Sequence, residues 1–549
     1  MAELYLGVDV GTGSVRAGLF DASGTLKGVG KHDIQIWRAA GERVEQSSDD
    51  IWSATCASVK AAMLAAGASA ADVRGIGFDA TCSLVLLDAG FQPVPAGPEQ
   101  DKRRNIIVWM DHRATAQAAR INATGHRVLR YVGGAISPEM ETPKLLWLKE
   151  NLRGSYDRTS HFLDLSDWLT FRATDDLTRS TCALVCKWTW IAHEHSWDDS
   201  YLDEIGLGDL KEADHARIGS RIVPPGTPLG AGLSPKAAAE LGLVPGIKVA
   251  AALIDAHAGA LATLGGHDVA GKAADPRHRM ALIMGTSACC MSLSPGDIGV
   301  KGLWGPYYDA ITPGYWLTEG GMSAAGAALD RFLVTHPLAR GAGGSLKPGL
   351  FEELEKAARA AAPDLSQAAL LARDIHILAD VNGNRSPLAD PEMRGIWSGI
   401  ALAEDAASLL RLHIAALCGL AYGLADILDQ QERSGLTGQD TIVISGGLGR
   451  SPLARQIIAD ATGRIVSLPA TDEPVLLGAA MLGSVAAGAF ASLEQGMAAM
   501  SRDAAQNLPA QGEIAAFHRR KRKVHTLLQG LDREARALMA APAGTPPAI

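Results

Sequence analysis

Cysteine is scarce in this sequence. Only 7 of the 549 residues are Cys, an odd number that is too small for a disulfide scaffold, and Cys182 and Cys186 have no second Cys/His pair at zinc-finger spacing. The first residues, MAELYLGVDVGTGS, also lack the basic and apolar segments of a signal peptide. We therefore expect a reducing, cytoplasmic compartment.

Basic residues are not in excess. Lys and Arg number 51 against 60 Asp and Glu, which gives a net charge of −9. This balance argues against a general surface for nucleic acid or for an anionic membrane. The run HRRKRK at 518–523 is the exception. It is either a nucleic-acid or localisation patch or a solvated helix face, and we expect the solvated face because short basic runs are common on surfaces.

The sequence has a long uncharged run at residues 474–493, PVLLGAAMLGSVAAGAFASL. Its 20 residues are enough to cross a bilayer. The run is rich in Ala and Gly, however, and lacks flanking Lys or Arg and an aromatic belt. It therefore predicts a buried, closely packed helix and no membrane contact.

The common nucleotide and hydrolase motifs are also missing. Residues 266–273, GHDVAGKA, approach the Walker A pattern, but Ala273 lacks the hydroxyl that would bind magnesium and no apolar strand precedes the loop. No Gly-x-Gly-x-x-Gly occurs at a strand-to-helix turn, and GMSAA at 321–325 misses the last glycine of a nucleophile elbow. P-loop and Rossmann functions therefore have no support, and the missing glycine argues against a serine hydrolase.

Strands and helices alternate along the chain, which predicts an α/β fold. A strand, a Gly-Thr turn and a second strand occur at 4–21 and again at 281–293, which indicates two related halves. Further expected strands are at 75–79, 84–87, 248–254 and 441–447, and expected helices are at 405–432 and 450–463.

Several small-residue turns lie next to carboxylates. Asp9 ends a strand and is followed by Gly-Thr-Gly-Ser, whose N–H groups and hydroxyls suit phosphate oxygens, while Asp9 could hold magnesium through water. An ordinary β-hairpin turn explains the same pattern, there and at 285–287. Asp255 follows an apolar run and opens a helix, so it is either an N-cap or a carboxylate at a strand end, where α/β clefts gather their chemistry. Taken singly, Asp79, Asp111, Lys187 and Glu319 are ambiguous.

Six segments together resemble the FGGY carbohydrate kinases. They are DVGTGSVRAGLFD (9–21), IDAHAGAL (254–261), IMGTSACC (283–290), ILADVNGNRSP (377–387), ISGGLGRSPLARQIIAD (444–460) and DEPVLLGAAMLG (472–483). The resemblance implies two ribonuclease-H-like domains of the actin/hexokinase/Hsp70 superfamily that flank a catalytic cleft. It divides the chain into a sugar- and phosphate-binding domain with the catalytic base (1–265), a hinge (266–279), a nucleotide-binding domain (280–490) and a helical C-terminal extension (491–549).

Three other segments are similar to the D-ribulokinase branch of the pentulose kinases. They are TCSLV (81–85), WMDHRA (109–114) and GGAISPEMETPKLLWL (133–148). The first differs from the Met-His pair of xylulokinases and the Arg-Glu pair of glycerol kinases, whereas L-ribulokinases have a similar Cys-containing segment. D-Ribulose is the expected substrate, with ribitol, L-ribulose and D-xylulose as alternatives.

The resemblance also implies roles for individual residues, with ATP and Mg²⁺ as cofactors. Asp255 would be the general base, and Asp9 and Asp255 would hold Mg²⁺. The sugar pocket would contain Thr81, Asp111, Lys187, Asp255 and Glu319. The ATP site would contain Thr12, Ser14, Arg16, Thr286, Gly326, Gly447 and Ser451.

The partner that this family implies is a small-molecule sugar, with neither nucleic acid nor membrane, and a homodimer is expected from the family alone. Two alternatives of other classes stay open. One is a non-catalytic sugar or nucleotide sensor on the same fold, and the other is an actin- or Hsp70-like ATPase that acts on protein partners. The presence of both Asp9 and Asp255 argues against the sensor.

Overall fold

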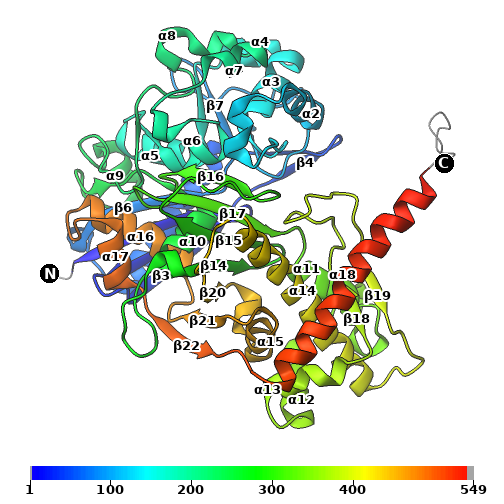
Figure 1. Cartoon of the computed structure of the whole chain (residues 1–549). Coiled ribbons are helices and arrows are strands. Elements are labelled where there is room, and N and C mark those ends of the chain that lie inside the picture. Colours follow the sequence, from blue (N-terminus) through cyan, green and yellow to red (C-terminus); the bar gives the residue numbers. More distant parts are fainter. Residues whose placement is uncertain (1–2, 541–549) are drawn as a thin grey trace.

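The computed structural model describes residues 3–540 as two α/β domains, each built on its own sheet (Figure 1). The first sheet has the order β12 (Lys248–Val249), β6 (Val73–Ala80), β1 (Leu4–Val10), β2 (Ser14–Asp21), β3 (Leu26–Asp33), and β13 (Leu253–Ile254) also pairs with β6. The predicted strand at 248–254 is thus two short strands. They are interrupted at Ala250, which instead bridges Pro228.

The second sheet repeats the arrangement of the first. Its order is β16 (Trp304–Tyr308), β17 (Trp316–Met322), β15 (Ala288–Ser294), β14 (Arg279–Met284), β20 (Thr441–Ser445), β21 (Ile465–Pro469), β22 (Asp503–Asn507). In each sheet an antiparallel hairpin, β1–β2 or β14–β15, lies beside a parallel strand, β6 or β20. The α/β fold and the two related halves are confirmed.

Two helices join the domains, because each packs on the sheet of the other domain. Helix α10 (Asp255–Leu264) follows the first sheet but packs on β14 of the second, and α16 (Pro474–Ala486) follows the second sheet but packs on β1, β6 and α10. A side chain at Gly77 of β6 would place its Cβ 1.9 Å from the carbonyl oxygen of Ala479. Close approach therefore explains the Ala/Gly-rich run, and the buried helix expected within 474–493 is confirmed.

The longest helix is α14 (Ala406–Arg433), which packs against α11 (Gly326–Leu333) and α15 (Pro452–Thr462) in the second domain. It is long and apolar enough to cross a membrane, but 78% of its most apolar window is buried inside the protein. Its apolar side chains therefore form the core of the second domain, as in many soluble α/β proteins.

A second layer extends the first domain, at the top of Figure 1. It is a sheet of order β4 (Trp37–Ala39), β5 (Arg43–Gln46), β8 (Ile106–Ile107), β7 (Leu84–Leu87), β9 (His161–Asp164). Helices α2 (Thr115–Thr124), α3 (Glu141–Asn151), α5 (Leu165–Thr174) and α6 (Thr181–Lys187) surround it. The segments that carry Thr81, Trp109 and Lys187 enter or leave this layer.

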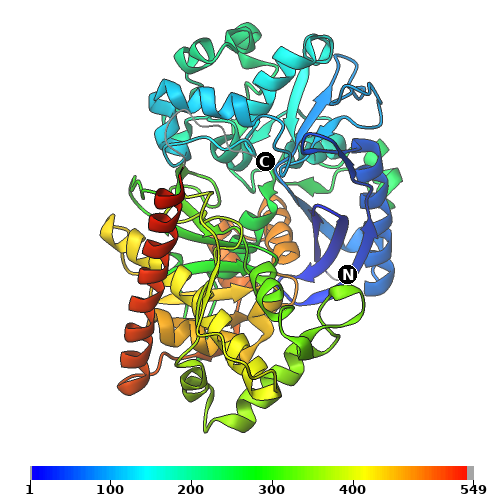
Figure 2. The same cartoon turned by 90° about the vertical axis from the view of Figure 1, so that its right-hand side faces the viewer.

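The C-terminal extension is not helical throughout, contrary to the expectation for 491–549. Residues 503–507 form β22, because they pair antiparallel with β21 at the open edge of the second sheet. Helix α18 (Glu513–Met539) then runs along the outside of the second domain in both views (Figures 1 and 2). Residues 541–549 of the extension lie outside the described residues.

The basic run 518–523 is only in part the solvated helix face that the sequence predicts. His518 and Lys521 are buried against the second domain, and Arg522 forms ion pairs with Asp426 and Asp429 of α14. These contacts use three of the six basic side chains to attach α18 to the domain.

Candidate active site

A cavity of about 190 Å³ lies between the two domains; we call it the first cavity. The first domain lines it with Thr12, Thr81, Cys82, Trp109, Glu139, Lys187, Ile254, Asp255, Ala256 and His257, and the second domain with Ser287, Cys289, Trp304, Glu319 and Arg385. It therefore contains polar side chains of both signs and both domains are needed to form it.

The sheet explains why Thr81 and Asp255 meet. Parallel strands β6 and β13 pair Ala80 with Ile254, so the next residue of each strand emerges at the same carboxyl edge. The Thr81 N–H also donates to the Val10 carbonyl, 3.0 Å away, at the end of β1. Both predicted site residues are thereby fixed by backbone pairing at the cavity wall.

The other predicted sugar-pocket residues divide into two groups. Lys187, the last residue of α6, and Glu319 on β17 line the cavity, and the Lys187 Nζ lies 4.9 Å from the centre of the Trp304 ring. Asp111 does not line it. Its carboxylate is buried, accepts hydrogen bonds from the Val44 N–H (2.6 Å) and forms an ion pair with Arg113 (2.7 Å). The structure thus gives Asp111 structural partners in place of a position in the predicted pocket.

Three carboxyl groups converge beside this cavity. Asp9 and Asp79 are register partners on β1 and β6, and Asp255 follows β13. Burial, reinforced by the charge of Asp9, raises the pKa of Asp255 to about 7. Burial and the charges of Asp9 and Asp255 also raise the pKa of Asp79 well above its ordinary value. A carboxyl with a pKa near neutrality suits a general base.

The same carboxylates fit a divalent cation. Mg²⁺ prefers carboxylate oxygens, and the Asp79 carboxyl is buried against that of Asp9, with no N–H donor of the described residues hydrogen-bonded to it. Arg16 already balances part of the charge. Its Nε donates to Asp9 Oδ2 (2.9 Å) and its Nη1 to Glu473 Oε2 (2.6 Å), so it also links the hairpin of the first domain to the start of α16.

A second cavity, of about 790 Å³, lies wholly in the second domain. It collects four of the predicted ATP-site residues: Thr286, Gly326, Gly447 and Ser451. A Cβ at Gly326 would lie 2.8 Å from the Gly285 carbonyl oxygen, so glycine lets α11 begin against the β14–β15 turn. Apolar side chains such as Leu448 and Phe351 form much of the remaining wall.

The three other predicted ATP-site residues lie apart from this second cavity. Thr12 lines the first cavity and accepts a hydrogen bond from the Trp109 Nε1, 3.0 Å away. Ser14 and Arg16 begin β2, and neither lines either cavity. Of these three residues of the hairpin, Thr12 therefore reaches the first cavity.

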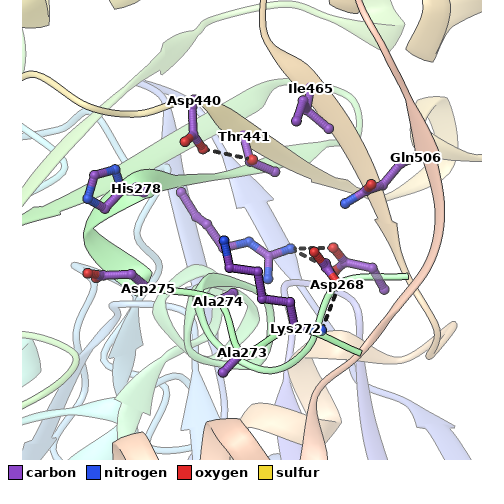
Figure 3. Close-up of a pocket in the computed structure, with 12 residues that line it drawn as sticks. Asp268, Lys272, Ala273, Ala274, Asp275, His278, Asp440, Thr441, Ile465 and Gln506 are labelled. Atoms are coloured by element: carbon purple, nitrogen blue, oxygen red, sulfur yellow. Dashed lines mark hydrogen bonds and ion pairs between the residues drawn. The ribbon is translucent and has the colours of Figure 1, made fainter. Parts of the chain in front are cut away.

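A third cavity, of about 450 Å³, lies at the end of the second sheet that is opposite to the second cavity (Figure 3). Figure 3 shows Thr441 and Ile465, the first residues of β20 and β21, facing Asp268 and Lys272. The Asp268 carboxylate accepts from the N–H groups of Ala270 and Lys272 at 2.9 Å. In a Walker A loop such N–H groups would bind phosphate, whereas here they bind a side chain of the loop itself. This agrees with the lack of support for a P-loop at 266–273.

Sequence reasoning missed several residues of the first cavity. Trp304, Glu139 and Arg385 are not part of any catalytic or binding motif, although Glu139 and Arg385 lie inside segments that carry the family resemblance, 133–148 and 377–387. His257 was also missed; its Nε2 lies 3.5 Å from the Cys186 Sγ, and burial lowers its pKa to about 4. The Asp-Ala-His sequence after the strand was the one available signal for His257.

Curated relatives cover most of the chain. A human "FGGY carbohydrate kinase domain-containing protein" is 45% identical over 517 residues, which is 91% of this chain and 91% of the relative. A D-ribulokinase of Saccharomyces cerevisiae is 36% identical over 523 residues, covering 89% of this chain and 72% of the relative.

Solved structures show the same fold. The crystal structure of xylulose kinase from Rhodospirillum rubrum superposes with a TM-score of 0.77 at 21% identity, covering 97% of this chain and 99% of the other. This likeness confirms the expected two-domain actin/hexokinase-like architecture. Family models for the N-terminal and C-terminal domains of the FGGY carbohydrate kinases match residues 4–262 and 280–487. The chain belongs to the FGGY family of carbohydrate kinases.

Proposed function

We propose that this sugar kinase transfers the γ-phosphoryl group of ATP to the 5-hydroxyl of D-ribulose, giving D-ribulose 5-phosphate and ADP. The observation that carries the proposal is the first cavity, which brings Thr81, Lys187, Asp255 and Glu319 together from four separate segments. The yeast relative named D-ribulokinase supports the choice of sugar. So does the TCSLV segment, since its Thr81 and Cys82 form part of the cavity wall.

In this mechanism Asp255 accepts the proton of the 5-hydroxyl. The hydroxyl oxygen then forms a bond to the γ-phosphorus while the bond from that phosphorus to the bridging oxygen breaks, and ADP leaves with the electron pair. A base with a pKa of about 7 is deprotonated in a large fraction of molecules at neutral pH. Lys187 and Glu319 offer a donor and an acceptor to the remaining hydroxyls and so fix the orientation of the sugar.

The second cavity is the proposed site for the adenosine and phosphates of ATP. Thr286, Gly326, Gly447 and Ser451 line it, and the Thr12, Ser14 and Arg16 hairpin would approach the transferred phosphoryl from the first domain. Asp9 and Asp255 would hold Mg²⁺, which supplies neutralisation of phosphate charge when bound.

We assign a separate role to each of the two domains. Residues 1–265 bind the sugar and provide the base, residues 280–490 bind the nucleotide, and 266–279 act as the hinge. Closure of the domains would remove water from the first cavity, and water is a competing acceptor of the phosphoryl group.

The test is release of ADP from Mg-ATP with D-ribulose, L-ribulose, ribitol, D-xylulose or glycerol, alongside a control without sugar. The proposal expects the highest kcat/KM for D-ribulose. A higher kcat/KM for another pentulose or pentitol would keep the mechanism and replace the substrate. Equal turnover with and without sugar would overturn the sugar kinase in favour of an ATPase, and sugar binding without turnover would favour a sensor.

A further inference from the structure

Arg385 enters the first cavity from the second domain with most of its hydrogen-bonding capacity free. Among residues 3–540 its guanidinium contacts only the Cys289 Sγ, 3.9 Å from Nη1, and the face of Trp304, whose ring centre is 5.5 Å away. A guanidinium has five N–H donors in a fixed fork. A hydroxyl-rich ligand in this cavity would give those donors the acceptors that they lack.

Charges on the first domain surround the same space. Glu139 also lines the cavity, and although burial opposes its ionisation, a hydrogen bond from His112 and the charges of Arg385 and Lys187 hold its pKa below the ordinary value. Arg385 and Glu139 form no ion pair within 4.0 Å in the described structure. The space between them would be filled by a small polar molecule that can both donate and accept hydrogen bonds.

The loop that carries Arg385 connects β18 (His376–Leu378) with β19 (Ile396–Ser398). Helix α18 fastens this loop from outside. Arg536 forms an ion pair with Asp390 at 2.5 Å, and Asp532 accepts a hydrogen bond from the Arg394 N–H at 3.2 Å. The Leu528 side chain packs in a small buried cluster with two apolar residues of this hairpin, Leu378 and Met393.

The inner side of the loop is fixed against the cavity wall. A Cβ at Gly302 would lie 1.9 Å from the Pro387 carbonyl oxygen, so the loop backbone touches the segment that leads into Trp304. Two residues before Pro387, Arg385 lies over that tryptophan. A continuous series of contacts therefore connects α18 to the sugar cavity. Helix α18 begins at Glu513, which lies beyond the residues that the family models match.

We propose that Arg385 is a sugar-binding residue and that α18 is the brace that positions it. The proposal rests on the proposed function, because it assigns a ligand contact in the same cavity. It also gives the C-terminal extension a role: Arg536 is a positioning residue that acts through Asp390 and the Arg385 loop.

The experiment compares five variants of the full chain: Arg385→Ala, Arg536→Ala, Arg536→Lys, the double Ala variant, and Arg520→Ala as the control. Arg520 is on the same helix and pairs with Glu513 at 2.6 Å, away from the loop. We expect Arg385→Ala to raise the sugar KM by about 10- to 100-fold with the KM for ATP unchanged. Arg536→Ala should raise the sugar KM by about 3- to 10-fold, Arg536→Lys should restore part of the loss, and Arg520→Ala should match the wild type.

The double variant tests the coupling. If Arg536 acts through Arg385, its loss adds little to the Arg385→Ala effect, whereas independent roles give the product of the two fold-changes. Additive effects, or a sugar KM within twofold of wild type in Arg385→Ala, would overturn the proposal. Sugar titrations by calorimetry, without ATP, accompany the kinetics. A wild-type protein that neither phosphorylates nor binds the panel sugars would instead overturn the proposed function, and the inference with it.

Discussion

The two candidate cavities of the active site differ in size and construction. The first holds about 190 Å³, is rich in charged side chains and takes its walls from both domains. The second holds about 790 Å³, also has charged side chains such as Glu355 and Lys356 in its wall, and belongs to the second domain alone. A site within one domain keeps its shape when the domains move, whereas a site shared between domains changes with every such movement.

This difference indicates how the enzyme can separate binding from chemistry. Under the proposed assignment, the second cavity can receive ATP whatever the relative position of the domains. The first cavity, where the sugar is proposed to bind, acquires Glu319, Trp304 and Arg385 only when the second domain is in place. Substitutions in the first cavity should therefore alter catalysis and sugar affinity, and those in the second should alter ATP affinity.

The largest effect is expected for Asp255→Asn. An amide cannot accept the hydroxyl proton, so kcat should fall by about 10³-fold while ATP still binds in the other cavity. Steady-state kinetics with D-ribulose and a direct titration of ATP measure the two quantities. Asp33→Asn, an exposed carboxylate on β3, is the control and should leave both unchanged. A kcat within tenfold of wild type would remove Asp255 as the base.

The sequence predicted much of this site, and the reasons are local. Asp9, Thr81 and Asp255 each end or directly follow an apolar strand, so their position at the carboxyl edge of a sheet could be inferred from the neighbouring residues. The two hairpins were visible for the same reason. A single strand at 248–254 failed because Ala250 pairs with Pro228, which is a contact that periodicity does not encode.

The residues that sequence reasoning missed depend on long-range packing. Arg385 reaches the first cavity because α18, more than a hundred residues later in the chain, holds its loop. Asp111 shows the converse. Its WMDHRA segment resembles a family motif, yet its carboxylate is directed to Val44 and Arg113 by the second sheet layer of the first domain. No local pattern distinguishes a carboxylate of this kind from one that faces a ligand.

Asp111→Asn tests whether Asp111 stabilises the first domain or binds the ligand of the first cavity. The change removes the charge that balances Arg113, which is 1% exposed and keeps one ion pair, to Glu45 at 2.9 Å. We expect a loss of about 3 kcal/mol of unfolding free energy, with the sugar KM of the folded enzyme unchanged. Chemical denaturation and kinetics measure these. A raised sugar KM together with wild-type stability would show that Asp111 binds the sugar after all.

Gly447→Val tests the second cavity alone. A Cβ at Gly447 meets no protein atom within 4 Å, so the new side chain should enter open space where the nucleotide is proposed to bind. We expect the KM for ATP to rise about tenfold, with the sugar KM and thermal stability unchanged. Gly299→Val is the matched control, since its Cβ also meets no atom and it lies outside both cavities. Equal increases in the KM for ATP and in the sugar KM would contradict the assignment of the two substrates to separate cavities.

The smallest effect is expected in the stability of the protein without ligands. Burial and the charge of Asp9 raise the pKa of Asp255 in the folded protein to about 7, from the 3.8 of an exposed aspartate, so the folded state holds this proton more tightly than the unfolded chain does. The resulting stabilisation is complete below pH 3.8 and is lost as the pH rises through about 7. Asp255→Asn, which has no charge to bury, should therefore gain in Tm relative to wild type by a few degrees between about pH 4 and pH 7, and the gain should level off at higher pH. Thermal unfolding in a chelating buffer measures it, with Asp33→Asn showing a constant offset. A difference between Asp255→Asn and wild type that does not change with pH would mean that the first cavity leaves Asp255 as well solvated as a surface carboxylate. The first cavity would then not be the desolvated site between two domains that distinguishes it from the second cavity.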